Sequence, residues 1–436
     1  MRYIIQRLSF VSVIPLLLAG MLLGGCNDDP STIGSSYLPQ NVEFHSYTLK
    51  PEDFSVLSDV SAAANSTAEG GLSILVGRAA RGTVAHGLIA FTTESPRVSG
   101  PAAKPVVGAT FSLRPLSYRF GDTNSRQLKF DLVVLDEIFA ANTKWSSALD
   151  ARIMAAPSLG TCNVPTYNDS TPVTFTLDPA ATQKFLQEYF RYDTTISGTQ
   201  TLREFRTLKT LALRATDSTG LVVGFLGAVG GNDSLLPTMS ITTADTTVQL
   251  RAGTTSWIAT NDIQKTTDQI VLAAGVPVRS LIRLNIDSIP AGATIHQAEL
   301  VMHIDEANSI TGTSGVTSYL MGYVGTDSSL AANSYLKSGI GRIIIGTRSV
   351  VDSTRFGDMF SFTGLGPVIS AWLLNRRQST LGYRNNGIIL AFNRSGSRSY
   401  QETTTTDRIA FHGPNASDPA LRPSLTITYS VQADAK

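Results

Sequence analysis

The sequence predicts an all-β fold: two tandem antiparallel β-sandwich domains of jelly-roll type, each with one short helix. Three observations lead to this fold class. The chain has 436 residues, of which 42% are hydrophobic and 16% charged, as is typical of a globular protein with more than one domain. Its 36 glycines and its alternation of apolar and polar residues favour short strands joined by turns. The order of five sequence features also occurs twice.

The first 25 residues have the features of a secretion signal. Residues 1–10 contain two arginines and no acid, and residues 11–25 form an apolar run too short for a comfortable membrane span. The run leads into Leu-Gly-Gly-Cys, the pattern of bacterial lipoprotein signals, in which small residues fit the peptidase and the cysteine thiol takes the lipid. We therefore expect residues 1–25 to be removed and Cys26 to carry the lipid, palmitate included, that anchors the protein to a membrane. The alternative is an ordinary secretory signal with a chance cysteine.

Residues 26–43 are polar and contain Pro, Gly and Ser, which predicts a flexible lipidated tether. The acidic pair Asp28 and Asp29 resembles the export signal of lipoproteins in Bacteroidetes-type bacteria, and this resemblance implies the outer membrane, facing the cell surface. A solvated linker is the alternative interpretation of the pair. The second cysteine, Cys162, has no partner once Cys26 is acylated, so no intrachain disulfide is expected.

The repeated features begin with an apolar strand, followed by Gly-Ala-Thr and an alternating strand. Gly-Ala-Thr occurs at residues 108–110 and again at 292–294. Gly292 is expected to relax the backbone at a turn. The strand after it alternates over residues 295–304, with a phase slip near Gln297 and Ala298.

The repeat continues with a short helix and two more strands in each half. Residues 177–190 and 365–377 both open near a proline and place apolar residues at helical spacing. Apolar strands then begin at residues 211 and 387, and each half closes with Pro and an alternating strand. The shared order predicts two copies of one domain, residues 44–246 and 247–431.

Two stretches of the second copy resemble a known family. "RSLIRLNIDSIPAGATIHQAEL" (279–300) and "RPSLTITY" (422–429) are similar to the DNRLRE-type β-sandwich domain of secreted bacterial proteins, a group that includes modules described as carbohydrate-binding. In the first copy Trp145 falls at the position of the family's tryptophan, whereas the second copy has none there. The region after Cys26 also resembles lipoproteins of the Bacteroidetes group. The resemblance implies a fold and no catalytic residue.

The residues offer little for catalysis. The five histidines form no metal-binding pair, and neither a nucleophile elbow nor a phosphate-binding loop occurs. We therefore expect no metal, no cofactor and no enzymatic activity. A formal net charge of +1 gives no basic excess, so no nucleic-acid partner is expected. A hydrolase would need two carboxylates facing each other across a cleft, and paired acids such as Asp305 and Glu306 keep that alternative open.

Sugar binding by a β-sandwich usually needs an exposed aromatic ring. Trp257 after a turn, Tyr400 in a long polar loop, and Trp145 are the candidate ligand-binding residues. Core packing of Trp145 and a solvated hairpin end at Tyr400 are the structural alternatives, and Trp372 is expected in the core. The sequence thus predicts a non-enzymatic surface lipoprotein that binds glycan or another extracellular polymer. A structural or assembly partner of envelope proteins is the second hypothesis, and a hydrolase is the third.

Overall fold

Among the residues that the computed structural model describes, 56% are in strands and 16% in helices, and the strand ladders are antiparallel. This composition fits the expected all-β class. The structure describes residues 42–59, 73–79, 82–91, 104–122, 127–139, 143–168, 170–189, 209–216, 220–228, 235–260, 269–276, 278–313, 319–324, 343–350, 356–378, 384–392 and 405–432. No helix in these ranges combines the length and the apolar character that a membrane crossing requires.

The elements of the first half are mainly strands of five to eight residues. They are β1 (Val42–Thr48), β2 (Phe54–Asp59), β3 (Ser73–Arg78), β4 (Val84–Phe91), β5 (Val106–Leu113), β6 (Pro115–Gly121), β7 (Leu128–Leu135), α2 (Ser147–Ala155), β8 (Ser158–Val164), β9 (Val173–Leu177), α3 (Pro179–Tyr189), β10 (Thr210–Ala215), β11 (Leu221–Leu226) and β12 (Thr238–Thr243).

The second half begins with the longest strand and has one α-helix within the described residues. Its elements are β13 (Thr247–Thr260), β14 (Gln269–Ala273), β15 (Arg279–Leu284), β16 (Thr294–His303), β17 (Tyr319–Val324), β18 (Ile343–Val350), β19 (Phe356–Phe362), α4 (Gly366–Arg377), β20 (Ile388–Ala391), β21 (Arg408–His412) and β22 (Ser424–Gln432).

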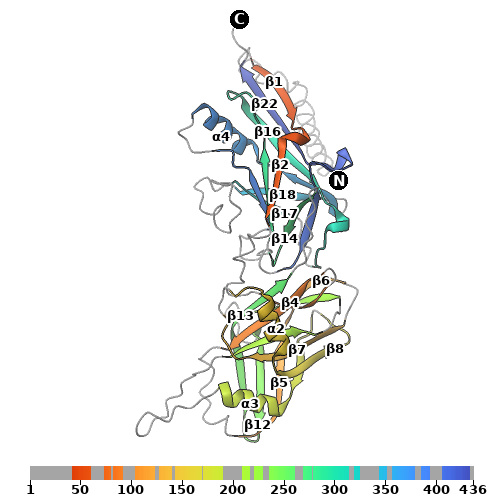
Figure 1. Ribbon diagram of the computed structural model, residues 1–436, viewed down its shortest axis with the longest axis vertical. Coiled ribbons are helices and arrows are strands. Elements are labelled where there is room, and N and C mark those ends of the chain that lie inside the picture. Colours follow the sequence, from red (N-terminus) through yellow and green to blue (C-terminus); the bar gives the residue numbers. More distant parts are fainter. Residues whose placement is uncertain are drawn as a thin grey trace, which may run out of the picture.

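The strands form two large sheets and one separate two-stranded sheet. The nine-stranded sheet has the order β1-β22-β16-β19-β18-β17-β20-β15-β2. The eleven-stranded sheet contains β6-β11-β3-β4-β13-β12-β5-β9, with β10, β7 and β8 branching from β4. The third sheet pairs β14 with β21. In Figure 1 the nine-stranded sheet occupies the upper part of the molecule and the eleven-stranded sheet the lower part.

Each large sheet encloses its own hydrophobic core. The first core draws its buried residues from positions between Ile74 and Ala252. The second core combines Leu49 and Phe54 with residues between Ile270 and Ile427. We call the parts built on these cores the first unit and the second unit.

The two units repeat one pairing scheme. In the first unit β12 pairs with β5, β5 with β9, β8 with β7, β7 with β10, and β10 with β4. In the second unit the corresponding ladders join β22 with β16, β16 with β19, β18 with β17, β17 with β20, and β20 with β15. The helices also correspond, since α3 packs on β5 and α4 packs on β16.

The first strands of the two repeats are exchanged. β1 pairs with β22 and β2 with β15, so residues 42–59 lie in the second unit. β13 pairs with β12 and with β4, so it lies in the first unit. The expected boundary between residues 246 and 247 therefore falls between two paired strands, and the cores do not follow the sequence repeats at this point.

The strand at residues 294–303 shows how local sequence sets register. The ladder between β16 and β22 shifts between Ile295 and Gln297, which confirms the phase slip expected there. Opposite β12, however, Ala109 pairs with Ile241, whereas opposite β22 Ala298 pairs with Ile427. Ala298 is thus the structural counterpart of Ala109, and the two Gly-Ala-Thr triplets are out of register with each other.

Gly292 does not have the expected conformational role. Its φ is not among the positive values of the described glycines, and a Cβ at this position would meet nothing within 4 Å. A residue with a side chain could therefore occupy this turn.

Two of the α-helices start at a side-chain cap. Asp178 accepts the N–H of Ala181 at the start of α3, and Ser146 accepts the N–H of Leu149 at the start of α2. The helix α2 is additional to the one expected in the first repeat, and it packs against β7 and β10. At the end of α4, Arg376 donates to the carbonyls of Ile286 and Ile289.

Candidate functional site

Two of the predicted site residues, Cys26 and Tyr400, lie outside the described residues. The other two lie in different surroundings. Trp257 is on β13 and only 6% exposed, with Leu75, Tyr118 and Val222 in the same apolar cluster. Its ring therefore offers no face to a sugar, and the expectation of an accessible Trp257 is corrected. The residues around it come from both units, since Val276 packs against this cluster.

Trp145 is partly buried and packs against the core of the first unit, as the structural alternative anticipated. It contacts the first core and stacks on His86, with ring centroids 5.5 Å apart and an interplanar angle of 8°. Trp372, on α4, is 2% exposed in the second core, as expected. The three tryptophans, 145, 257 and 372, thus contribute to packing.

His86 pairs with a carboxylate in a way that a hydrolase could use, but water does not reach it. Its Nε2 lies 3.0 Å from Asp150 Oδ1, and its Nδ1 accepts the N–H of Ala215. The side chain has no exposed surface. Burial lowers the pKa of His86, against the hydrogen bond and charge of Asp150. The pair therefore holds α2, which carries Asp150, on the sheet.

The junction between the units contains a buried carboxylate. Asp407 has no exposed surface and accepts hydrogen bonds from the Tyr118 hydroxyl at 2.9 Å and the Gly312 N–H at 2.8 Å. Burial raises the pKa of Asp407 to about 6, against these two hydrogen bonds. Its Oδ2 has no hydrogen-bond partner among the described residues. Tyr118 comes from β6 and Asp407 immediately precedes β21, so this contact joins the two units.

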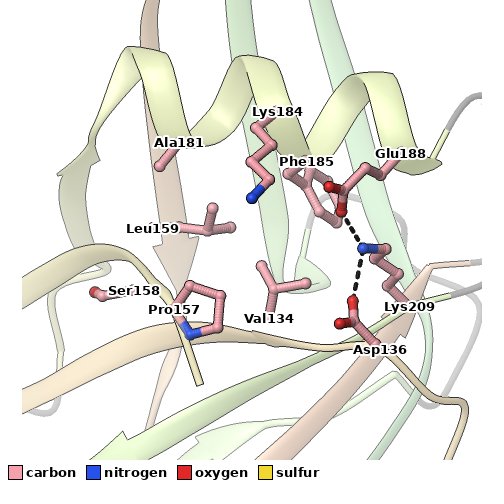
Figure 2. Close-up of a pocket in the computed structure, with 10 residues that line it drawn as sticks. All are labelled: Val134, Asp136, Pro157, Ser158, Leu159, Ala181, Lys184, Phe185, Glu188 and Lys209. Carbon is pink, nitrogen blue, oxygen red and sulfur yellow. Dashed lines mark hydrogen bonds and ion pairs between the residues drawn. The ribbon is translucent and has the colours of Figure 1, made fainter. Parts of the chain in front are cut away.

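A small hollow lies beneath α3 in the first unit. Figure 2 shows the helix above it and Lys184 reaching over it from α3. Its volume is about 120 Å³, below the roughly 300 to 1,000 Å³ of drug-sized ligand pockets. The floor is apolar, and the lining residues are Val134, Asp136, Pro157, Ser158, Leu159, Ala181, Lys184, Phe185, Glu188 and Lys209.

Three of the four charged groups that line this hollow are paired with one another. Lys209 donates to Asp136 at 2.7 Å and to Glu188 (Figure 2). Burial opposes the charge on Lys209, but the hydrogen bonds to the two carboxylates hold its pKa above its ordinary value. The arrangement fixes the end of α3 against β10 and leaves space for only a few atoms.

An exposed aromatic pair lies on the outer face of the second unit. Phe44 on β1 is 58% exposed, and its ring centroid is 5.3 Å from that of His296 on β16. Ser430, between them on β22, bonds His296 Nε2 at 2.8 Å. Among the described side chains, Phe44 is the one Phe, Tyr or Trp ring that is exposed.

Hydroxyl groups extend from this pair along the same face. Across the ladder, Ser46 is opposite Thr428 and Thr48 is opposite Thr426. The hydroxyls of Thr48 and Thr426 lie 3.2 Å apart. We call these residues together with Phe44 and His296 the Phe44 patch. A flat ring next to hydroxyl donors and acceptors can stack on the apolar face of a sugar and bond its hydroxyls.

Sequence reasoning did not select the Phe44 patch. Phe44 and His296 lie 252 positions apart, and the strand exchange brings them together. The available signal was Phe44 itself, an aromatic residue between the polar residues Glu43 and His45 in a short alternating strand.

The chain matches no known family model, no curated protein and no solved structure. Within the part of the chain that the structure describes, no group of three or more His, Cys, Asp or Glu side chains is placed to hold a metal ion.

Proposed function

We propose that this chain is a non-enzymatic, outer-membrane lipoprotein, anchored through Cys26, that binds glycan or another extracellular polymer at the cell surface. The two units serve as tandem β-sandwich modules of jelly-roll type. The Phe44 patch carries this proposal, because its exposed ring and adjacent hydroxyls supply both contacts that sugar recognition requires. The module that binds is then the second unit, to which the tether at residue 42 is joined.

The test is a glycan array probed with the mature chain carrying Cys26→Ser. We expect Phe44→Ala to abolish binding, because it removes the stacking surface and leaves the hydroxyls in place. Leu57→Ala is the matched control, since Leu57 is 49% exposed on β2 of the same segment. Tyr400→Ala tests whether the polar loop around Tyr400, a candidate binding site from the sequence, contacts the glycan. Binding that survives Phe44→Ala and is lost with Tyr400→Ala would move the site to that loop.

The second hypothesis is a structural or assembly partner of envelope proteins. β1 and β2 end the strand order of the nine-stranded sheet, so each has one edge without a strand partner among the described residues. Such an edge can pair with a strand of another protein. Stable co-purification with an envelope protein, lost when Ser46→Pro removes an N–H of β1 and retained with Phe44→Ala, would favour this function over glycan binding.

A further inference from the structure

We propose that residues 42–59 act as a donor segment that a second copy of this chain can take up, so that two copies are joined by exchanged strands. The proposal is independent of the proposed function. It starts from the two strands of this segment, β1 and β2, whose ladder partners β22 and β15 both belong to the second repeat.

The segment is attached to the second unit by pairing and by apolar burial. β1 is in register with β22 along its whole length, from Val42 opposite Gln432 to Thr48 opposite Thr426. Leu49 and Phe54 are 4% and 7% exposed in the second core. Two strands and two buried anchors therefore define a complete acceptor site, formed by β22, β15 and the core between them.

The first unit contains the same acceptor site, filled by β13. The first part of β13 pairs with β12, the counterpart of β22, and its later part pairs with β4, the counterpart of β15. Val248, Leu250 and Ala252 enter the first core, as Leu49 and Phe54 enter the second. The fold thus already accepts an equivalent segment that comes from a different repeat.

Exchange between copies needs no new interface. The donor segment would meet the same β22, β15 and core residues in a neighbouring copy, so the contacts formed equal those lost. Residues 60–72 connect β2 to β3, and a stretch of this length spans at most about 45 Å when extended.

The experiment uses two full chains with different tags, both carrying Cys26→Ser. One carries Ser46→Cys and the other Thr428→Cys, positions that face each other across the ladder. The remaining cysteine, Cys162, is buried, and burial raises the pKa of its thiol to about 12, so it does not compete. The chains are co-expressed and oxidised, and disulfide-linked species are separated on a non-reducing gel.

We expect a disulfide-linked dimer that carries both tags, and a dimer mass by light scattering. The matched control replaces Thr428→Cys with Thr242→Cys on β12, the corresponding strand of the first unit, and should give no two-tag dimer. A single chain with both Ser46→Cys and Thr428→Cys shows that the variants fold, because it closes internally. The proposal is overturned if the double-cysteine chain closes internally while the co-expressed pair gives no two-tag dimer. It is also overturned if Thr242→Cys gives as much two-tag dimer as Thr428→Cys.

Discussion

At the scale of single residues, Asp407 has a protonation state that the fold controls. Its carboxyl group lies between the units, without exposed surface, and accepts hydrogen bonds from Tyr118 and Gly312. Its folded-state pKa of about 6 lies above the value of about 3.9 that an unfolded chain has. The folded protein therefore binds more protons between these two pH values, and stability falls as the pH rises through this window.

Replacing Asp407→Asn should remove this pH dependence. The free energy of unfolding of the variant, relative to wild type, should rise by about 2 kcal/mol between pH 4 and pH 7.5. Urea denaturation at the two pH values measures it. Asp305→Asn is a control that should show the opposite pH dependence. Burial alone would raise the pKa of Asp305, but hydrogen bonds from Asn308 and Gln269 hold it below its ordinary value. The wild-type protein therefore loses the stability contributed by the Asp305 carboxylate as the pH falls. If the unfolding free energies of Asp407→Asn and wild type differ by the same amount at both pH values, Asp407 does not have the raised pKa.

Lys209 is the second residue with a specific expected effect. Substitution Lys209→Met leaves Asp136 and Glu188 facing each other without their cation, so the free energy of unfolding should fall by about 1 to 2 kcal/mol. Lys184→Met is the matched control at the same hollow, because Lys184 is exposed, and it should change stability by less than about 0.5 kcal/mol. If thermal or urea denaturation shows the same loss of stability for Lys209→Met and Lys184→Met, the ion pairs of Lys209 with Asp136 and Glu188 do not stabilise the fold.

The candidate site illustrates what residue types alone cannot predict. The sequence suggests that Trp257 follows a turn and is accessible, but the structure places it within β13, where Val276 and Gly275 from the second repeat pack against it. The sequence presents Phe44 as one residue of a short strand. Its ring lies next to His296 because β22 pairs with both β1 and β16. Both outcomes depend on contacts between residues distant in sequence, which periodicity does not encode.

At the scale of elements, apolar and alternating stretches predicted four strands in each repeat, apolar residues at helical spacing predicted the helices α3 and α4, and a phase slip predicted the bulge near Gln297. These features depend on local sequence. The register between repeats was harder to predict, because the identical Gly-Ala-Thr triplets suggested one alignment and the buried residues Ala109 and Ala298 impose another. Burial decides the alignment, because shifting a strand by one residue turns its apolar side chains outward.

Turns at the junction should respond to substitution very differently from turns at the surface. Gly275 has a φ of 77°, and a Cβ there would come within 2.7 Å of Trp257 Cη2 and 2.8 Å of the Thr405 carbonyl oxygen. Gly275→Ala should lower the free energy of unfolding by about 2 kcal/mol, from backbone strain and this overlap. Gly292→Ala, in open space, should cost less than about 0.5 kcal/mol. Similar melting temperatures for the two variants would show that the junction does not pack as described.

At the scale of the whole molecule, the exchange of first strands decides which residues stabilise which unit. The sequence repeats were predicted from the shared order of features, and the two units do share one pairing scheme. The exchange itself was not predictable, because both segments supply apolar residues that can enter a core, Leu49 and Phe54 in one and Val248 and Leu250 in the other. A sequence pattern specifies that a strand is half-buried, and does not specify its partner.

Two matched substitutions test the exchange within one chain. Leu49→Ala and Leu250→Ala remove the same atoms from the second and first cores, and each should cost about 2 to 5 kcal/mol. Hydrogen exchange measures where the protection is lost. Leu49→Ala should expose the amides of β15 and β22, and Leu250→Ala those of β4 and β12. If Leu49→Ala instead exposed the amides of β4 and β12, and Leu250→Ala those of β15 and β22, each repeat would keep its own first strand.

The ladder between β1 and β22 also has a mechanical consequence. Val42 and Gln432, near the two ends of the chain, are opposite each other at one end of this ladder. A force applied between the two ends would peel the strands apart one residue pair at a time, at low load. A force on the tether along the axis of β1 would act on all seven pairs simultaneously. The lipid anchorage that we propose would thus resist a pull along β1 better than a pull that peels β1 from β22.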